Sequence, residues 1–170
     1  MESNHKGQLG IDFLYKDKLP SVIVYTDGSC TRNPGGAGGW ASIIYKGKEK
    51  KEIYGGINET TSNRMELTAA IKALEYLEEP SNVKLFSDSA YLVNSISLKW
   101  ILGWERKDWK ASTTKPVKNP DLWKQLLELC RKHYVIMVHI RGHTGNPSNE
   151  RCDELSRGCS IFYELENLKT

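Results

Sequence analysis

Four acidic side chains and one histidine are the residues with which this chain could do chemistry: Asp27, Glu66, Asp88, Asp153 and His143. Clustered carboxylate oxygens bind hard divalent cations, and Mg²⁺ prefers a few carboxylates together with water and substrate phosphate. Four acids can hold two ions, and two ions about 3.5 to 4 Å apart can activate a water on one side of a phosphodiester and stabilise the leaving oxygen on the other. These residues therefore favour metal-assisted phosphodiester chemistry if the fold brings them together.

The two aspartates Asp27 and Asp88 each end a short apolar run, at 22–27 and 83–88. Such runs are typical of strands buried on both faces, and Gly28 is expected to end the first one. If the two strands are parallel neighbours, both carboxylates lie at the sheet edge where α/β proteins bind ligands. For either aspartate alone, capping of the following turn is the commoner explanation. The repetition of the pattern favours a shared site.

Glu66 stands in the first turns of a predicted amphipathic helix that follows N-cap candidates at 60–63 and ends before Pro80. The apolar face of this helix is formed by Leu67, Ala70, Ile71, Leu74 and Leu77. The spacing of Asn63 and Glu66 also fits a capping box, which would give the glutamate a purely structural role. The sequence alone leaves both interpretations of Glu66 open.

The other elements follow from hydrophobic periodicity and turn residues. The glycine-rich stretch 29–39 is expected to be an irregular loop, and it lacks the spacing of a nucleotide-binding P-loop. Strands are predicted at 40–45, 51–57 and 134–140, and helices at 90–96, at 121–133 and from Pro147 onward. The last helix carries Asp153, and its expected buried stripe is Cys152, Leu155, Cys159 and Phe162. This order predicts a three-layer α/β fold, with one mixed five-stranded sheet and helices on both faces.

Length and composition favour one ordinary globular domain, here placed at 21–165 after an N-terminal extension, 1–20, of unknown role. No apolar run reaches membrane-spanning length, and the first residues lack the core of a signal peptide. We therefore expect a monomeric cytoplasmic protein without a membrane partner. Its four scattered cysteines are expected to be reduced.

Basic character is concentrated in residues 98–119, which carry a net charge of +4 while the remainder of the chain sums to −1. A local excess of lysine and arginine is the electrostatic footprint of a polyanion-binding segment. The same stretch holds three of the five tryptophans. We expect the lysines to contact phosphates and the tryptophans to form a rigid base, one of them facing nucleic acid; these residues are Trp100, Trp104, Lys107, Trp109, Lys110 and Lys115.

At these positions the sequence resembles type 1 ribonuclease H of the bacterial kind. The resemblance covers about 21–160. It rests on several motifs in order: Tyr25-Thr-Asp-Gly-Ser-Cys-Thr-Arg-Asn-Pro-Gly35, Thr61-Ser-Asn-Arg-Met-Glu-Leu67, Ser87-Asp-Ser89, the basic stretch through Asn119, Gly142-His143 and Asn149-Glu-Arg-Cys-Asp-Glu154.

The resemblance implies an endoribonuclease that hydrolyses the RNA strand of RNA/DNA hybrids and leaves 3′-hydroxyl and 5′-phosphate ends. It implies that the four acids bind two Mg²⁺ ions, with Mn²⁺ as a possible substitute, and that His143 assists proton transfer or product release. Residues 98–119 would hold the DNA strand. The contacts to RNA 2′-hydroxyls would come from Asn33 and Asn63, and Thr61 would contribute to a DNA-phosphate pocket.

Two other function classes remain open from the sequence. A non-catalytic hybrid- or duplex-binding module would use the basic stretch alone, but it leaves four acids unexplained in a protein that must attract phosphate. An integrase- or resolvase-like nuclease on the same fold would use the acids, and fold analogy cannot separate it from a ribonuclease. The basic stretch and the Gly142-His143 pair favour the ribonuclease.

Overall fold

The computed structural model describes residues 9–169, which form a mixed α/β domain. In chain order the elements are a 3₁₀ helix η1 (Phe13–Lys18), β1 (Ser21–Cys30), β2 (Gly38–Lys46), β3 (Glu49–Ile57), α1 (Ser62–Tyr76), β4 (Asn82–Ser87), α2 (Ala90–Ser97), α3 (Trp100–Arg106), α4 (Pro120–Lys132), β5 (Tyr134–His139) and α5 (Pro147–Asn167). The strands and helices follow the predicted order. The helix η1 was not predicted, and α3 lies within the stretch that was predicted only as a basic insert.

The five strands make one sheet in the order β3-β2-β1-β4-β5. β1 pairs antiparallel with β2, and β2 with β3, whereas β1 and β4, like β4 and β5, are parallel. The prediction of a mixed five-stranded sheet is therefore confirmed. The parallel pairing of β1 with β4 runs through Tyr25 and Phe86, so Asp27 and Asp88, each two residues further on, reach the same edge of the sheet.

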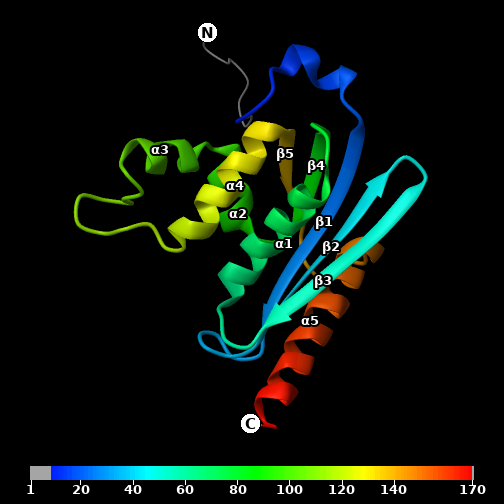
Figure 1. The fold of residues 1–170 in the computed structure, drawn as a ribbon, viewed down its shortest axis with the longest axis vertical. Helices are drawn as coiled ribbons and strands as arrows, with labels where there is room; N and C mark the ends of the chain where they lie inside the picture. Colours follow the sequence, from blue (N-terminus) through cyan, green and yellow to red (C-terminus); the bar gives the residue numbers. More distant parts are fainter. Residues whose placement is uncertain (1–8, 170) are drawn as a thin grey trace.

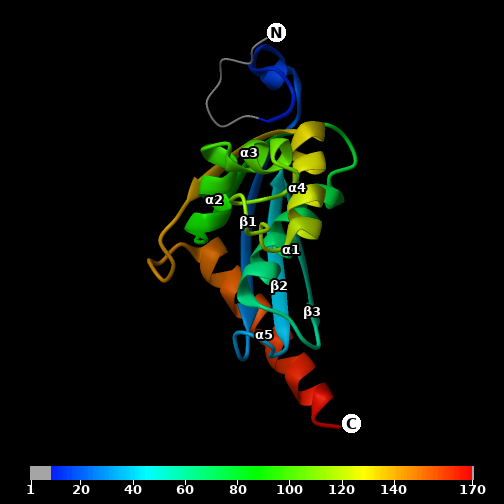
Figure 2. The ribbon, with the colours of Figure 1, turned by 90° about the vertical axis from the view of Figure 1, so that its left-hand side faces the viewer.

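Helices cover both faces of the sheet, as Figures 1 and 2 show, with α1, α2 and α4 on one side and α5 on the other. The main core lies between the sheet and the helices α1, α2 and α4, and it includes Val22, Val24, Leu74, Leu85, Trp123 and Leu126. Each such buried Leu or Val contributes about 1.5–3 kcal/mol relative to an exposed one. α5 packs against β1, β2 and β3, and two isoleucines on its side of the sheet stay exposed: Ile23 near the start of β1 is 40% exposed, and Ile136 in β5 is 44% exposed.

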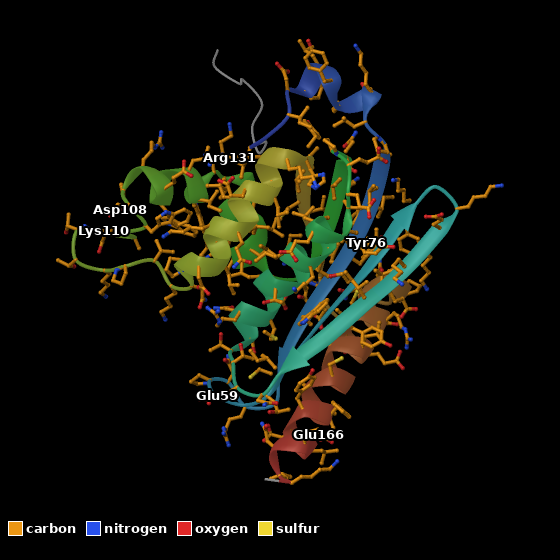
Figure 3. The ribbon with its side chains drawn as sticks, in the orientation of Figure 1. Glu59, Tyr76, Asp108, Lys110, Arg131 and Glu166 are labelled. Atoms are coloured by element: carbon orange, nitrogen blue, oxygen red, sulfur yellow. The ribbon has the colours of Figure 1, made fainter. Side chains whose placement is uncertain are left out.

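The basic stretch projects from the body of the protein as α3 followed by an irregular segment, on which Figure 3 labels Asp108 and Lys110. Its base is anchored, because the ring of Trp104 lies 5.2 Å from that of the fully buried Trp123. A backbone hydrogen bond of 2.9 Å from Val117 to the carbonyl of Trp109 closes the segment. The projecting segment is thus a shaped lobe on a packed base.

The glycine-rich loop is shorter than predicted. β1 continues past Gly28 to Cys30 and β2 begins at Gly38, so the irregular part is 31–37 and not 29–39. Gly38 and Gly39 belong to β2, and neighbouring groups leave no room for a side chain at either position. A Cβ on Gly39 would overlap the carbonyl oxygen of Ser156 in α5. The glycines here permit close packing and do not mark a loop.

The predicted buried stripe of α5 is partly wrong. Cys152 is fully buried, Leu155 and Cys159 are only partly buried, and Phe162 is 57% exposed. The side that faces the sheet instead carries small residues, namely Asn149, Cys152, Ser156 and Ser160. Small side chains allow α5 to approach the glycines of β2 closely, and this leaves no room for a large apolar stripe.

The described part of the N-terminal extension packs on the domain beside the start of β1. Leu9 contacts the main core, and the ring of Phe13 lies 6.3 Å from that of Tyr134. The side chain of Asp12 caps η1 by accepting a hydrogen bond of 3.0 Å from the backbone N–H of Leu14. Residues 1–8 of the predicted extension lie outside the described residues. Within 9–169, no helix combines the length and the apolar character needed to cross a membrane.

Candidate active site

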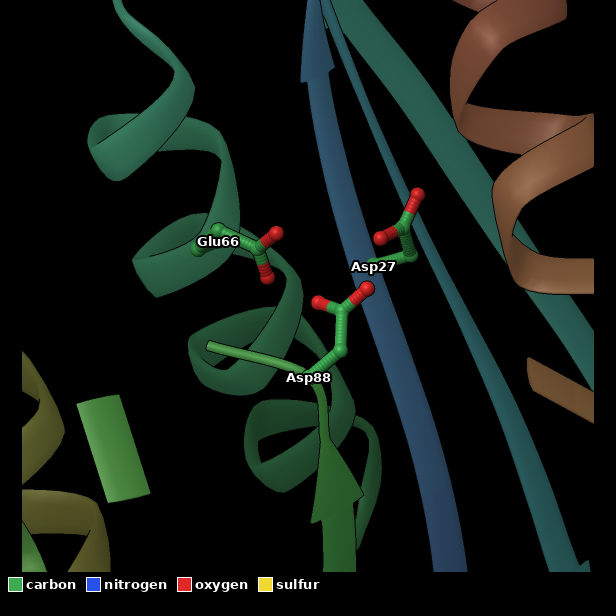
Figure 4. Close-up of side chains that lie close together, drawn as sticks. All are labelled: Asp27, Glu66 and Asp88. Atoms are coloured by element: carbon green, nitrogen blue, oxygen red, sulfur yellow. The ribbon is translucent and has the colours of Figure 1, made fainter. Parts of the chain in front are cut away.

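Three of the predicted acids meet at one edge of the sheet. Asp27 in β1, Glu66 in α1 and Asp88 directly after β4 each offer a carboxylate oxygen, and these three oxygens lie within 4.8 Å of one another. Figure 4 shows the three carboxyl groups turned toward a common point. Three oxygens at this spacing, from three separate elements, are the ligand set that a hard divalent cation prefers.

Glu66 does not take part in capping α1, because this helix begins at Ser62, two residues before the start that an Asn63 cap would give. The N-cap is Thr61, whose hydroxyl accepts a hydrogen bond of 3.3 Å from the backbone N–H of Arg64. Asn63 lies inside the first turn and is exposed. The capping-box interpretation of Asn63 and Glu66 is therefore wrong, and Glu66 faces Asp27 and Asp88.

Burial and mutual repulsion make the ionised state of this group costly. Burial raises the pKa of Asp27 to about 7, with repulsion from Asp88 and Asp153 adding to the rise and a hydrogen bond from Ser156 opposing it. Burial, then Asp27 and Asp88, raises the pKa of Glu66 well above its usual range. Among the described atoms, the buried Oε2 of Glu66 finds no hydrogen-bond partner. A bound cation would coordinate this oxygen and offset the repulsion, so the residues fit a metal.

Asp153 stands near the cluster but outside it. Its carboxylate raises the pKa of both Asp27 and Asp88, which places it within electrostatic reach. In the described structure its Oδ2 accepts a hydrogen bond of 2.6 Å from Nη2 of Arg157, one turn later in α5. The fold thus brings the fourth predicted acid to the same edge, paired with an exposed arginine.

His143 lies in the loop between β5 and α5 and is exposed. Its backbone is in the left-handed region, with φ of 59°, and its neighbour Gly142 packs on the site: a Cβ there would stand 2.9 Å from Oδ2 of Asp88. The ring of His143 counteracts the rise in the pKa of Asp88 that burial and Asp153 produce. The predicted histidine therefore reaches the carboxylates from the solvent side.

The predicted RNA- and DNA-contacting residues Asn33, Thr61 and Asn63 gather around the start of α1. Oδ1 of Asn33 accepts a hydrogen bond of 3.3 Å from the backbone N–H of Ser62, which ties the loop after β1 to this helix. Asn33 and Asn63 are exposed and Thr61 is partly buried. All three are thus tied to the first turn of α1, the helix that carries Glu66.

The predicted cations lie on the projecting segment, where Lys107, Lys110 and Lys115 are all exposed. Lys107 and Lys110, with two hydroxyl residues, line a hollow of about 390 Å³. Of the three tryptophans, Trp104 and Trp109 pack against the main core, and Trp100 is 42% exposed. That one of them contacts nucleic acid stays a prediction.

Sequence reasoning missed the connection between this segment and α1. Arg64 donates two hydrogen bonds to Asp121, of 2.7 and 3.1 Å, and a third of 3.1 Å to Oδ1 of Asn119. Arg64 is two residues before Glu66, and Asn119 ends the basic stretch. A charged pair at a distance of 57 residues leaves no local pattern in the sequence, which is why it was not predicted.

Comparison with known proteins decides the family. The family model described as RNase H matches residues 20–160. The chain belongs to the type 1 ribonuclease H family. Two relatives are named Ribonuclease H. The one from Nitratidesulfovibrio vulgaris strain DP4 is 52% identical to this chain over 136 residues, and the one from Moorella thermoacetica is 48% identical over 139 residues. These alignments cover 80% and 82% of this chain, and 86% and 91% of the relatives.

Solved ribonuclease H structures have the same fold. The crystal structure of LC9-RNase H1, a type 1 RNase H with the type 2 active-site motif, is 25% identical with a TM-score of 0.76 and covers 85% of this chain and 74% of that one. LC11-RNase H1, solved in complex with an RNA/DNA hybrid, has a TM-score of 0.63 at 24% identity and covers 83% and 97%. The predicted family and fold class are confirmed.

Proposed function

We propose that this chain hydrolyses the RNA strand of RNA/DNA hybrids with two divalent metal ions, Mg²⁺ or, as a substitute, Mn²⁺. The observation that carries the proposal is the group of three buried or half-buried carboxylates, whose oxygens lie within 4.8 Å of one another in a chain of the ribonuclease H family. A non-catalytic hybrid-binding module would gain nothing from this costly arrangement.

The four acids would hold the metal ions. Asp27, Glu66 and Asp88 form the core of the site, and we assign Asp153 as the fourth ligand because its charge already acts on Asp27 and Asp88. When bound, the two ions would activate the attacking water and stabilise the leaving oxygen. The water oxygen joins phosphorus as the P–O3′ bond breaks, which leaves a 5′-phosphate and a 3′-hydroxyl.

His143 would handle a proton and would not hold metal. It is exposed on a loop that reaches Asp88 from the solvent side, so its ring can exchange protons with water. We therefore assign it proton transfer or assistance to product release.

The hybrid would be held on both sides of the carboxylates. The exposed lysines of residues 98–119 would bind phosphates of the DNA strand. Near the start of α1, Asn33 and Asn63 would read RNA 2′-hydroxyls, and Thr61 would contribute to a DNA-phosphate pocket. LC11-RNase H1, a structural neighbour of this chain, has been solved with an RNA/DNA hybrid, which supports this class of substrate.

We also propose a monomer that works in the cytoplasm, with 21–165 as the catalytic unit. The four cysteines are unpaired in the described structure, and this state is compatible with a reducing compartment. Integrase- or resolvase-like activity is less well supported, because the basic segment 98–119 and the Gly142-His143 pair favour the ribonuclease and the RNase H family model matches residues 20–160.

The direct test is cleavage of labelled RNA/DNA hybrid, duplex DNA and duplex RNA, each with Mg²⁺, with Mn²⁺ and with EDTA. We expect cleavage of the RNA strand of the hybrid only, abolished by EDTA, with 3′-hydroxyl and 5′-phosphate ends. Cleavage of duplex DNA would favour the integrase-like alternative. Metal-independent binding without any cleavage would favour the binding module.

A further inference from the structure

We propose that Ser156 is a positioning residue for this reaction, which holds Asp27 in the orientation that binds metal. The proposal rests on the proposed function. The hydroxyl of Ser156 donates a hydrogen bond of 2.5 Å to Oδ2 of Asp27, from α5 to β1. Ser156 is 0% exposed and Asp27 5% exposed, so water does not compete for this contact.

The hydrogen bond separates the two oxygens of Asp27 into two tasks. Figure 4 shows one oxygen of Asp27 turned toward Glu66 and Asp88 and the other turned toward α5. The oxygen on the α5 side is occupied by Ser156, so the remaining oxygen faces the place where a cation would bind. Partners of this kind orient the carboxylates that ligate metals.

Ser156 itself is held in place by the packing of its helix. The backbone of α5 approaches β2 so closely that a Cβ on Gly39 would overlap the carbonyl oxygen of Ser156. The small neighbours Cys152 and Ser160 are buried on the same side of the helix. The hydroxyl therefore projects from a fixed point of the backbone.

Among the described residues, the hydroxyl has one competing acceptor, the backbone carbonyl of Asp153 at 3.2 Å. A serine hydroxyl has a single proton, and the shorter bond to a carboxylate is the stronger of the two. Donation to Asp27 therefore prevails, and it links Asp27 to the turn of α5 that carries Asp153. Ser156 thus fixes two of the four proposed metal ligands relative to each other.

The test compares Ser156→Ala with Ser160→Ala. Ser160 is also buried in α5, but its hydroxyl donates to the carbonyl of Arg157 at 2.8 Å, so its loss removes the same group without touching a carboxylate. Mn²⁺ binding to the free protein is measured by calorimetry, and kcat and KM for hybrid are measured at saturating Mg²⁺. We expect Ser156→Ala to bind Mn²⁺ about tenfold more weakly, with unchanged KM for hybrid. Ser160→Ala should stay within about twofold of the wild type in both respects.

Wild-type affinity for Mn²⁺ in Ser156→Ala would overturn the role of Ser156 while leaving the proposed function intact. An equal loss in both variants would also overturn it, because packing of α5 would then be the cause. Failure of the wild-type protein to bind Mn²⁺ would overturn the proposed function and this inference together. Thermal unfolding in EDTA confirms that both variants are folded.

Discussion

Gly28 and Glu66 touch through their backbones. A Cβ on Gly28 would overlap the backbone nitrogen of Glu66 and the carbonyl carbon of Met65, so β1 and α1 can meet at this point only without a side chain. This contact sets the depth at which Glu66 enters the site beside Asp27. One glycine therefore positions two of the acids.

Replacing Gly28 by Ala should separate β1 from α1. We expect a loss of stability of about 1–3 kcal/mol from overpacking and a larger loss of activity, because the carboxylates move apart. Urea denaturation and hybrid cleavage measure the two effects. The control is Gly103→Ala in α3, where no described atom outside the adjacent residues and the helix's own backbone lies within 4 Å of the new Cβ, and where the helix should be stabilised slightly. Equal behaviour of the two variants would contradict this account of Gly28.

Metal-free protein should become less stable as the pH rises from about 4 to 7. Burial raises the pKa of Asp27 from 3.8 to about 7, so the folded chain keeps a proton that the unfolded chain has released in this interval. Unfolding is therefore favoured progressively, and the full penalty is present above pH 7. The raised pKa values of Glu66 and Asp88 act in the same direction.

The measurement is urea denaturation in EDTA at pH 5 and pH 8, for the wild type and for Asp27→Asn. The wild type should lose about 2–3 kcal/mol more than the variant between these values. Added Mg²⁺ should restore stability to the wild type chiefly at pH 8, because Asp27, with a pKa of about 7, is largely ionised there. An identical pH response of both proteins would show that Asp27 titrates normally.

The lysines of the projecting segment should affect binding and leave turnover unchanged. Lys107, Lys110 and Lys115 are exposed, so changing all three to Ala should remove phosphate contacts without disturbing the core. KM for hybrid should rise and the salt slope of binding should fall by about 1 for each lost contact, while kcat stays constant. Steady-state kinetics at several salt concentrations provide both quantities. If KM and slope do not change, the hybrid is held elsewhere.

His143→Ala should be milder than loss of a metal ligand. Its ring is exposed and acts on Asp88 only through its charge, so Mn²⁺ binding should be retained while kcat falls by about 10²-fold, the scale of general acid–base assistance. Added imidazole should recover part of the lost turnover. Loss of metal binding in this variant would show that His143 helps to hold the ion.

The sheet edge that carries Asp27 and Asp88 was predictable because both residues end apolar runs, and parallel strands bring such ends together. The place of Glu66 was left open, since a capping box and a metal ligand share the same local pattern. In the structure Thr61, and not Asn63, is the N-cap of α1, which rules out the capping box.

The packing of α5 could not be predicted from its own residues. Its buried side depends on Gly39 in a distant strand, so the periodicity that suggested Phe162 as a core residue was misleading. The contact between Ser156 and Asp27 and the pairing of Asp153 with Arg157 depend on the same register. Both follow from how a helix lies on a sheet, which a local pattern does not contain.

The measurement that tests the central claim most directly is the behaviour of Asp88→Asn on labelled RNA/DNA hybrid. The amide keeps the shape of the side chain but removes one ligand charge from a group whose three oxygens lie within 4.8 Å of one another. We predict that the variant binds hybrid with wild-type affinity and does not cleave it at any Mg²⁺ concentration. Substantial Mg²⁺-dependent cleavage by Asp88→Asn would contradict the account.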